Sequence, residues 1–310
     1  ITSMNCILCN NTLQNSSIVH TNVRGDIGKN AKIVKCYNCS HIQLLEYGNN
    51  LKCHYDTDSQ SKEIVKTFNT TIEVIIEKEK VEIKRRLYHM CNELKIDFTN
   101  KQVLDMGSGY QTFVKELKNK FPTCIIDSVE PSEKRSELGC KINNVNKGLI
   151  NIENCYIDNE YAAINKSKYD IVTAWHVFEH IDKSIHDILT NLKQITKPGG
   201  LILIEVPNEN DELLQLEKYS NINYMIHHMS YFNEKTFSYL LNKNNLNSYT
   251  IQHVQRYGLK NFINWMYSMG MDYSNDMNDV STTNEIERFW LQSKIKNKNT
   301  DALLAIIINE

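Results

Sequence analysis

The stretch Gln102–Gln111, which reads Gln-Val-Leu-Asp-Met-Gly-Ser-Gly-Tyr-Gln, decides the fold of this 310-residue chain. A short apolar run leads to Asp105 and then to a turn that contains Gly107 and Gly109. Apolar residues at helical spacing follow over 112–121. A strand, a glycine turn and a helix in this order open a nucleotide-binding α/β domain. The glycines let the backbone bend tightly and let a ligand approach it closely.

An acidic residue follows the next apolar run. Cys124–Val129 reads as a second strand and is followed at once by Glu130. An acid about 20 residues after such a glycine turn, as Glu130 is after Gly109, is placed to accept hydrogen bonds from ribose hydroxyls. A solvated loop acid is the alternative for Glu130 taken alone, and its place at a strand end favours the binding role.

Further strands alternate with helical segments. We expect a third strand near Cys155–Ile157, a fourth over Tyr169–Ala174 and a fifth over Leu201–Val206. This rhythm predicts an α/β fold with a doubly wound, mainly parallel sheet, in which the ligand lies beyond the carboxyl ends of the strands. The residues at those ends, which we place in the cofactor site, are Asp105, Gly107, Gly109, Glu130, Asp158, Trp175 and His176.

Four of the nine cysteines form two Cys-x-x-Cys pairs, Cys6/Cys9 and Cys36/Cys39, on either side of the segment 10–35. Two such pairs can place four thiolates tetrahedrally around zinc, and four protein ligands make a structural site. The surrounding sequence is poor in apolar residues, so a metal would supply what its core cannot. Incidental buried or redox-active cysteines are the alternative. Residues nearby that could replace a ligand are His41, Cys53 and His54.

Composition and length set the wider frame. We divide the chain into a metal-binding module (1–45), a linker with amphipathic helices (46–97) and a main domain (98–310). The net charge of −2 argues against a broad nucleic-acid surface. No apolar run reaches the roughly 20 residues of a membrane helix. The N-terminus lacks the pattern of a signal peptide, and we expect a cytoplasmic protein.

These motifs resemble a known family. Val-Leu-Asp-Met-Gly-Ser-Gly (103–109), followed by the strand that ends in Glu130, resembles the S-adenosylmethionine site of class I methyltransferases, and Tyr169–Val206 looks like their fourth and fifth strands. The cysteine pairs and the segment His227–Phe232 are similar to sugar-modifying methyltransferases, including the zinc-containing nucleotide-sugar C-methyltransferases. We expect no counterpart of the large C-terminal domain of that last group, so both O- and C-methylation stay open.

The resemblance implies a role for each cofactor residue. Gly107 and Gly109 would lie against the methionine portion and the ribose, and Asp105 would fix the turn and the amino group. Glu130 would bind the ribose hydroxyls, and Asp158 or its neighbour Asn159 the adenine edge. A dinucleotide is disfavoured, because Thr112 stands where Gly-x-Gly-x-x-Gly has its third glycine.

Methyl transfer to a hydroxyl also requires a base. Histidine titrates close to neutral pH and suits that role. We favour His228, with His176 and His180 next, and we include His227 in the candidate group. Tyr231 would orient the base or bind the acceptor, which we expect to be a sugar, a nucleotide sugar or a related small molecule.

Two other functions stay open. A ribosomal or transfer RNA methyltransferase could dock its zinc ribbon on RNA, but residues 4–45 offer few cations for this (Arg24, Lys29, Lys32 and Lys35). In addition, the fourth strand does not end in the Asn/Asp-Pro-Pro-aromatic turn that binds a planar amino group. This disfavours methylation of an amino group on a nucleic-acid base. A non-catalytic module that binds S-adenosylmethionine is the second alternative. The sequence gives no indication of the oligomeric state.

Overall fold

The structure is a computed structural model that describes residues 5–25, 31–45, 62, 65–67, 69–182, 184–267 and 285–310. The chain forms two compact units. Unit 1 contains Ile1–Leu51, His176–His186 and Glu205–Ala305. Unit 2 contains Lys52–Trp175, Asp187–Ile204 and Ile306–Glu310.

A seven-stranded sheet is the largest element among the described residues, with the order β10-β11-β8-β7-β4-β5-β6. Parallel pairing joins β4 to β5 and to β7, and β5 to β6. The doubly wound, mainly parallel α/β fold predicted from the sequence is confirmed. The strands are β4 (Gln102–Met106), β5 (Ile125–Val129), β6 (Ile150–Glu153), β7 (Tyr169–Trp175), β8 (Thr196–Pro207), β10 (Tyr249–Val254) and β11 (Ala302–Ile308).

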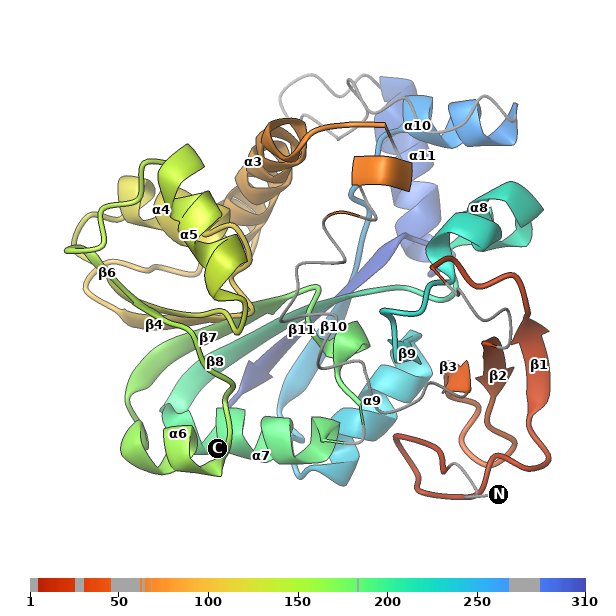
Figure 1. Cartoon of the computed structure of the whole chain (residues 1–310), viewed down its shortest axis with the longest axis horizontal. Helices are drawn as coiled ribbons and strands as arrows, with labels where there is room; N and C mark the ends of the chain where they lie inside the picture. Colours follow the sequence, from red (N-terminus) through yellow and green to blue (C-terminus); the bar gives the residue numbers. More distant parts are fainter. Residues whose placement is uncertain are drawn as a thin grey trace. The chain divides into compact units, whose positions relative to one another are not determined.

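Helices cover both faces of the strands of unit 2. Figure 1 shows α4 and α5 on one side of these strands and α6 and α7 on the other. This arrangement agrees with the burial of β4 and β7, in which nearly every residue on both faces is buried. The helices are α3 (Ile72–Tyr88), α4 (Thr112–Lys120), α5 (Glu133–Ile142), α6 (Asn159–Ile164), α7 (Ile185–Ile195), α8 (Glu217–Asn223), α9 (Glu234–Lys243), α10 (Leu259–Met266) and α11 (Glu285–Lys296).

Unit 1 contains a second, smaller sheet with the order β1-β2-β3-β9 (Figure 1). Its strands are antiparallel where they pair: β1 (Ser17–His20) with β2 (Lys32–Lys35), β2 with β3 (Ile42–Leu45), and β3 with β9 (Ser230–Tyr231). The cysteine-bearing segment therefore pairs with a strand from a much later part of the chain. Residues from both segments share one apolar core: Val23, Ala31, Ile33, Ile42, Leu44, Tyr224, Ile226, Met229 and Tyr231.

The third strand of the large sheet was predicted at the wrong place. It runs over Ile150–Glu153 and not near Cys155–Ile157. β6 is an edge strand that pairs only with β5, so it needs only one buried face. Ile150 and Ile152, two positions apart, provide this face. The apolar Ile157 instead leads into α6. Among the described residues, no helix is long and apolar enough to cross a membrane.

Candidate functional site

The glycine turn after β4 has the backbone that its sequence predicts. Gly107 and Gly109 have φ values of 68° and 53°, a region that residues with side chains rarely adopt. A Cβ added at Gly109 would meet only one atom within 4 Å, the Arg135 Cδ at 3.9 Å. The space beside this turn is therefore open enough for a ligand to approach the backbone.

The carboxylate of Glu130 lies directly against this turn. One oxygen accepts from the backbone N–H of Gly109 at 2.9 Å, and the other accepts from that of Ser132 at 3.0 Å. A carboxylate offers about four acceptor positions, so these two bonds leave capacity for further donors. The arrangement fits a pair of ribose hydroxyls, and the ribose role of Glu130 stays a prediction.

A buried hydrogen-bond network of Ser108, Gln111 and Ser128, which was not predicted from the sequence, supports the turn. The Ser108 hydroxyl lies 2.6 Å from that of Ser128, and the Gln111 amide donates to Ser108 at 2.8 Å. Gln111 is fully buried and has a φ of 61° where α4 begins. A left-handed residue with a side chain is uncommon, and this one directs its amide back toward the serines. The network fixes the shape of the turn before any ligand binds.

Asp105 is buried at the carboxyl end of β4 and accepts a hydrogen bond of 2.6 Å from the Thr173 hydroxyl on β7. Burial raises the pKa of Asp105 to about 7, although the Thr173 hydrogen bond and the charge of Arg86 oppose that rise. A buried carboxyl with a pKa this far from its ordinary value is typical of a binding site. Its predicted role toward the cofactor stays a prediction.

Trp175 ends β7 with a buried donor. Its ring meets that of Phe113 edge-on at 5.3 Å between centroids, and the Arg86 guanidinium lies 5.0 Å from the ring. The indole N–H has no hydrogen-bond partner within the described parts of the chain. Buried donors are nearly always satisfied, so this one is suited to an acceptor on a bound molecule.

Asp158 has a structural role as well as the predicted one. It is exposed and caps α6, because its carboxylate accepts the backbone N–H of Tyr161 at 2.9 Å. Its predicted contact with adenine is not needed to explain why an acid stands there. That contact stays a prediction.

His176 follows Trp175 directly and lies among charged groups of unit 1. Its Nδ1 is 3.2 Å from a Glu179 oxygen, and its Nε2 is 3.1 Å from a Glu205 oxygen. Arg256 Nη1 lies 3.0 Å from the same Nε2. The φ of His176 is 54°, a costly conformation that tends to occur at functional sites.

The remaining candidate histidines gather beside this group. The His180 Nδ1 donates to the backbone carbonyl of His227 at 2.7 Å, and the His180 and His228 rings meet edge-on at 4.8 Å between centroids. Burial, reinforced by His180 and Arg24, holds the pKa of His228 well below its ordinary value. The imidazole of His228 is thus neutral at neutral pH.

Tyr231 braces the segment that carries His228. Its hydroxyl accepts the backbone N–H of Met225 at 2.9 Å and donates to the carbonyl of the same residue at 3.1 Å. Burial raises the pKa of Tyr231 well above its ordinary value, so it stays a phenol. This geometry fits an orienting residue, which is one of the two roles predicted for it.

A family described as "Methyltransferase domain" matches residues 80–251, which is more than half of the chain. The chain belongs to this family. It is a class I methyltransferase that depends on S-adenosylmethionine, and residues 80–251 include the whole of β4, the glycine turn, β7 and the histidine group. The prediction of a methyltransferase is therefore confirmed. The family match does not support the alternative of a non-catalytic module.

Solved structures share the fold of this methyltransferase. One is an S-adenosylmethionine-dependent methyltransferase from Archaeoglobus fulgidus, with a TM-score of 0.51 and 17% identity over 79% of this chain and 97% of that one. Another is a possible histamine N-methyltransferase from Thermotoga maritima, with a TM-score of 0.51 and 10% identity over 84% of this chain and 100% of that one. No curated protein sequence matches this methyltransferase significantly.

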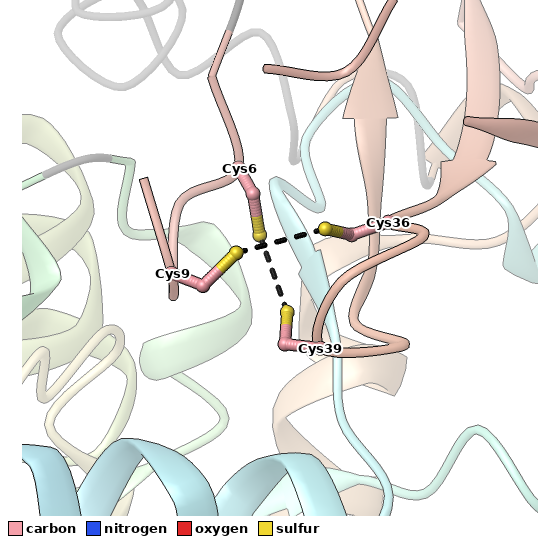
Figure 2. Close-up of side chains that lie close together, drawn as sticks. All are labelled: Cys6, Cys9, Cys36 and Cys39. Carbon is pink, nitrogen blue, oxygen red and sulfur yellow. Dashed lines mark hydrogen bonds between the residues drawn. The ribbon is translucent and has the colours of Figure 1, made fainter. Parts of the chain in front are cut away.

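The four paired cysteines of the methyltransferase converge (Figure 2). The sulfurs of Cys6 and Cys39 lie 3.5 Å apart, and those of Cys9 and Cys36 lie 3.6 Å apart. A tetrahedral zinc site with Zn–S bonds of about 2.3 Å has sulfurs about 3.8 Å apart, so the group needs almost no adjustment. Although burial raises the pKa of the Cys9 thiol, hydrogen bonds from Asn11 and Asn38 lower it to about 6.

The two cysteine turns have matching backbones. The carbonyl of the first cysteine in each pair accepts an N–H from the residue after the second, Asn10 in one turn and Ser40 in the other. Both acceptor distances are 2.9 Å, and both of these residues have a positive φ. His41 is not among the gathered ligands, because its Nε2 lies 3.2 Å from the Ser230 hydroxyl. Cys53 and His54 lie outside the described residues.

Several site residues were not singled out from the sequence. Thr173, Glu205 and Arg256 contact predicted residues that are 68, 29 and 80 positions away in the chain. Thr173 and Glu205 stood where a signal exists, because each lies one position before the carboxyl end of a predicted strand. Arg256 carried no such signal. Arg86 on α3 could not be found by pattern, because an arginine on an amphipathic helix is ordinary.

Asp105→Asn should change how stability depends on pH. The folded pKa of Asp105, about 7, exceeds its unfolded value. Its contribution to stability is therefore complete below about pH 4 and is lost as pH rises through 7. The free energy of unfolding of the wild type should fall relative to Asp105→Asn across this range, by up to about 4 kcal/mol. Urea unfolding of both proteins at pH 5 and pH 8 captures about two thirds of this difference, because the remaining third is already lost between pH 4 and pH 5. Equal pH slopes for the two proteins would contradict the prediction.

Proposed function

We propose that this methyltransferase transfers a methyl group to a small hydroxyl-bearing or carbon-acidic acceptor, a sugar or nucleotide sugar, and that an imidazole of the histidine group accepts the acceptor's proton. The observation that carries the proposal is the environment of His176, between the carboxylates of Glu179 and Glu205. The similarity of the cysteine pairs and of His227–Phe232 to sugar-modifying methyltransferases supports the choice of acceptor.

Chain connectivity brings this histidine near the cofactor residues. Thr173 donates to Asp105, and only Ala174 and Trp175 stand between Thr173 and His176. Three steps of extended chain span at most about 11 Å. This short connection supports the proposal that His176 acts on a substrate at the strand end where S-adenosylmethionine is predicted to bind.

Bound S-adenosylmethionine would supply an electrophilic methyl group. The glycine turn would let this molecule lie against its backbone, and the Glu130 carboxylate and the Trp175 indole N–H would hold it by hydrogen bonds. The protein's larger contribution is to hold the acceptor in line and to remove its proton. Nδ1 of His176 donates to Glu179, which orients the imidazole. Nε2 then carries the lone pair that would take the acceptor's proton, in place of the Arg256 N–H that it now faces.

Within the group we assign the base to His176 and not to His228, which the sequence favoured. A general base works best when its pKa lies near the working pH. The pKa of His228 is held well below its ordinary value, which leaves it a weak proton acceptor. His176 instead has one carboxylate, Glu179, that orients its ring through Nδ1, and its Nε2 faces the Arg256 N–H with a lone pair.

The acceptor class is tested by measuring S-adenosylhomocysteine formation. The purified protein is incubated with S-adenosylmethionine and a panel of nucleotide sugars, free sugars, and transfer and ribosomal RNA. Product with a nucleotide sugar or sugar supports the proposal. Product with RNA alone would overturn the choice of acceptor and favour the RNA-docking alternative, which predicts a steep loss of binding with salt.

His176→Gln should lower turnover on that acceptor by about 10²–10⁴-fold, the usual contribution of a general base. Calorimetric titration with S-adenosylmethionine measures separately whether His176 also contacts the cofactor, as predicted from the sequence. His253→Gln is the matched control, because His253 also pairs with a glutamate, Glu234 at 3.0 Å, but lies outside the group. Full turnover in His176→Gln would remove His176 from the base role while leaving the methyltransferase assignment intact.

We also propose zinc as the ion of the four cysteines. Thiolate ligands in a tetrahedral arrangement favour zinc among the divalent ions, and a site with four protein ligands is structural. The module boundary near residue 45 and the linker over 46–97 remain part of this proposal. Metal analysis of the purified protein should give zinc, one equivalent of which Cys9→Ser releases.

A further inference from the structure

A second group of metal-ligating side chains lies in unit 1, apart from the cysteines. Glu179, His180 and His228 each place one ligand atom within 4.8 Å of the others. Glu179 and His180 come from the short 3-10 turn Phe178–His180, and His228 comes from the segment that precedes β9. We propose that these three side chains bind one divalent first-row transition-metal ion.

Glu179 supplies the strongest argument. One of its oxygens lies 3.2 Å from His176 Nδ1, while the other is buried and has no hydrogen-bond partner in the described part of the chain. The side chain is only 2% exposed. A buried carboxylate oxygen without a partner is costly, and a cation at that oxygen removes the cost. Burial raises the pKa of Glu179, but the neighbouring His176 and His180 bring this pKa below its ordinary value.

His180 is held in the tautomer that a metal requires. A backbone carbonyl can only accept, so the contact of 2.7 Å with the His227 carbonyl places the proton on Nδ1 of His180. Its Nε2 therefore carries the lone pair. A ligating histidine typically donates its other ring N–H to a carbonyl in this way.

His228 completes the group as a neutral imidazole. Its ring meets that of His180 at an interplanar angle of 77°, so the two rings do not stack and their nitrogens can face a common point. The Nε2 of His180 lies 4.0 Å from Oε1 of Glu179, the oxygen that also faces His176, and the partnerless oxygen belongs to the same carboxylate. Ligand atoms around a tetrahedral ion with bonds of about 2.1 Å are about 3.4 Å apart, so the side chains must draw in by roughly 1 Å.

The ligand set narrows the ion. Two imidazoles and one carboxylate suit zinc, cobalt, nickel, iron or manganese and offer too little oxygen for calcium or magnesium. Three protein ligands also leave open coordination positions, unlike the four cysteines. The idea that the methyl acceptor binds the ion through an oxygen at such a position rests on the proposed function. Metal binding itself does not.

Cobalt is the probe that separates this site from the cysteines. The full chain, with its cysteine site loaded with zinc, is titrated with Co²⁺ and followed by visible absorption. We expect one equivalent of Co²⁺ to bind with d–d bands and without the charge-transfer band of thiolate ligands. Absence of this equivalent, or its appearance only with thiolate charge transfer, would overturn the proposal.

Substitutions locate the binding. Glu179→Gln and His228→Phe should each weaken Co²⁺ binding by at least about tenfold, and His228→Phe keeps a ring against Tyr231. His253→Gln is the matched control and should bind Co²⁺ as the wild type does. Retained zinc and an unchanged far-ultraviolet spectrum show that each variant is folded. Wild-type affinity in both ligand variants would place the ion elsewhere and overturn the proposal. No methyl acceptor is present, so this result is independent of the proposed function.

Discussion

Gly139→Ala is expected to abolish binding of S-adenosylmethionine and to destabilise the protein by more than about 4 kcal/mol. A Cβ at this position in α5 would lie 2.1 Å from the backbone oxygen of Tyr110 and 2.3 Å from its carbonyl carbon. No rotamer change relieves a clash with backbone, so α5 or the glycine turn must move. Tyr110 directly follows Gly109, and any such shift displaces the surface predicted to face the cofactor.

Local hydrogen bonds make this clash harder to relieve. The Asn143 amide donates to the same Tyr110 oxygen at 2.9 Å, which fixes the turn against the end of α5. Denaturant unfolding and calorimetric titration with S-adenosylmethionine measure the two effects. Gly148→Ala is the matched control, because its added Cβ would meet only the end of a side chain, the Asn146 Oδ1 at 3.2 Å. Near-wild-type stability and affinity in Gly139→Ala would show that α5 packs less closely than described.

The parts of the fold that the sequence predicted are those with a local signal. β4 lies where the apolar run and the glycine turn placed it, because a buried strand needs consecutive apolar residues. The positive φ of Gly107 and Gly109 follows from the same turn. The cysteine group was predictable because metal ligands impose a spacing that few other structures need.

What escaped prediction depends on residues far apart in the chain. The need for glycine at 139 arises from Tyr110 on another element, and a glycine within a helical pattern otherwise reads only as a weak helix former. The partners of His176 come from β8 and from the loop after β10. β9 is very short and has no readable period, so its pairing with β3 could not be foreseen. The predicted roles of individual site residues still await experiment.

Cys36→Ser is expected to release the ion of the four cysteines and to unfold the small sheet of unit 1. Folding of a small metal module draws on a metal-binding free energy of about 10–16 kcal/mol, and its apolar core alone is too small to replace that. The loss should reach the histidine group, because Ile33 and Leu44 share a core with Ile226 and Met229, which flank His227 and His228. We therefore expect methyl transfer to fail even though no cysteine takes part in it.

Hydrogen exchange separates this local loss from global unfolding. In Cys36→Ser, or after chelation of the wild type, amide protection should disappear in β2 and β3 while it persists in β4 and β5, where the predicted cofactor residues lie. Binding of S-adenosylmethionine should survive for the same reason. Cys155→Ser, which alters a half-buried cysteine of unit 2, is the matched control and should keep both zinc and protection. If β2 and β3 stay protected in metal-free Cys36→Ser, their stability comes from the core shared with Ile226 and Met229, and the ion is not what folds them.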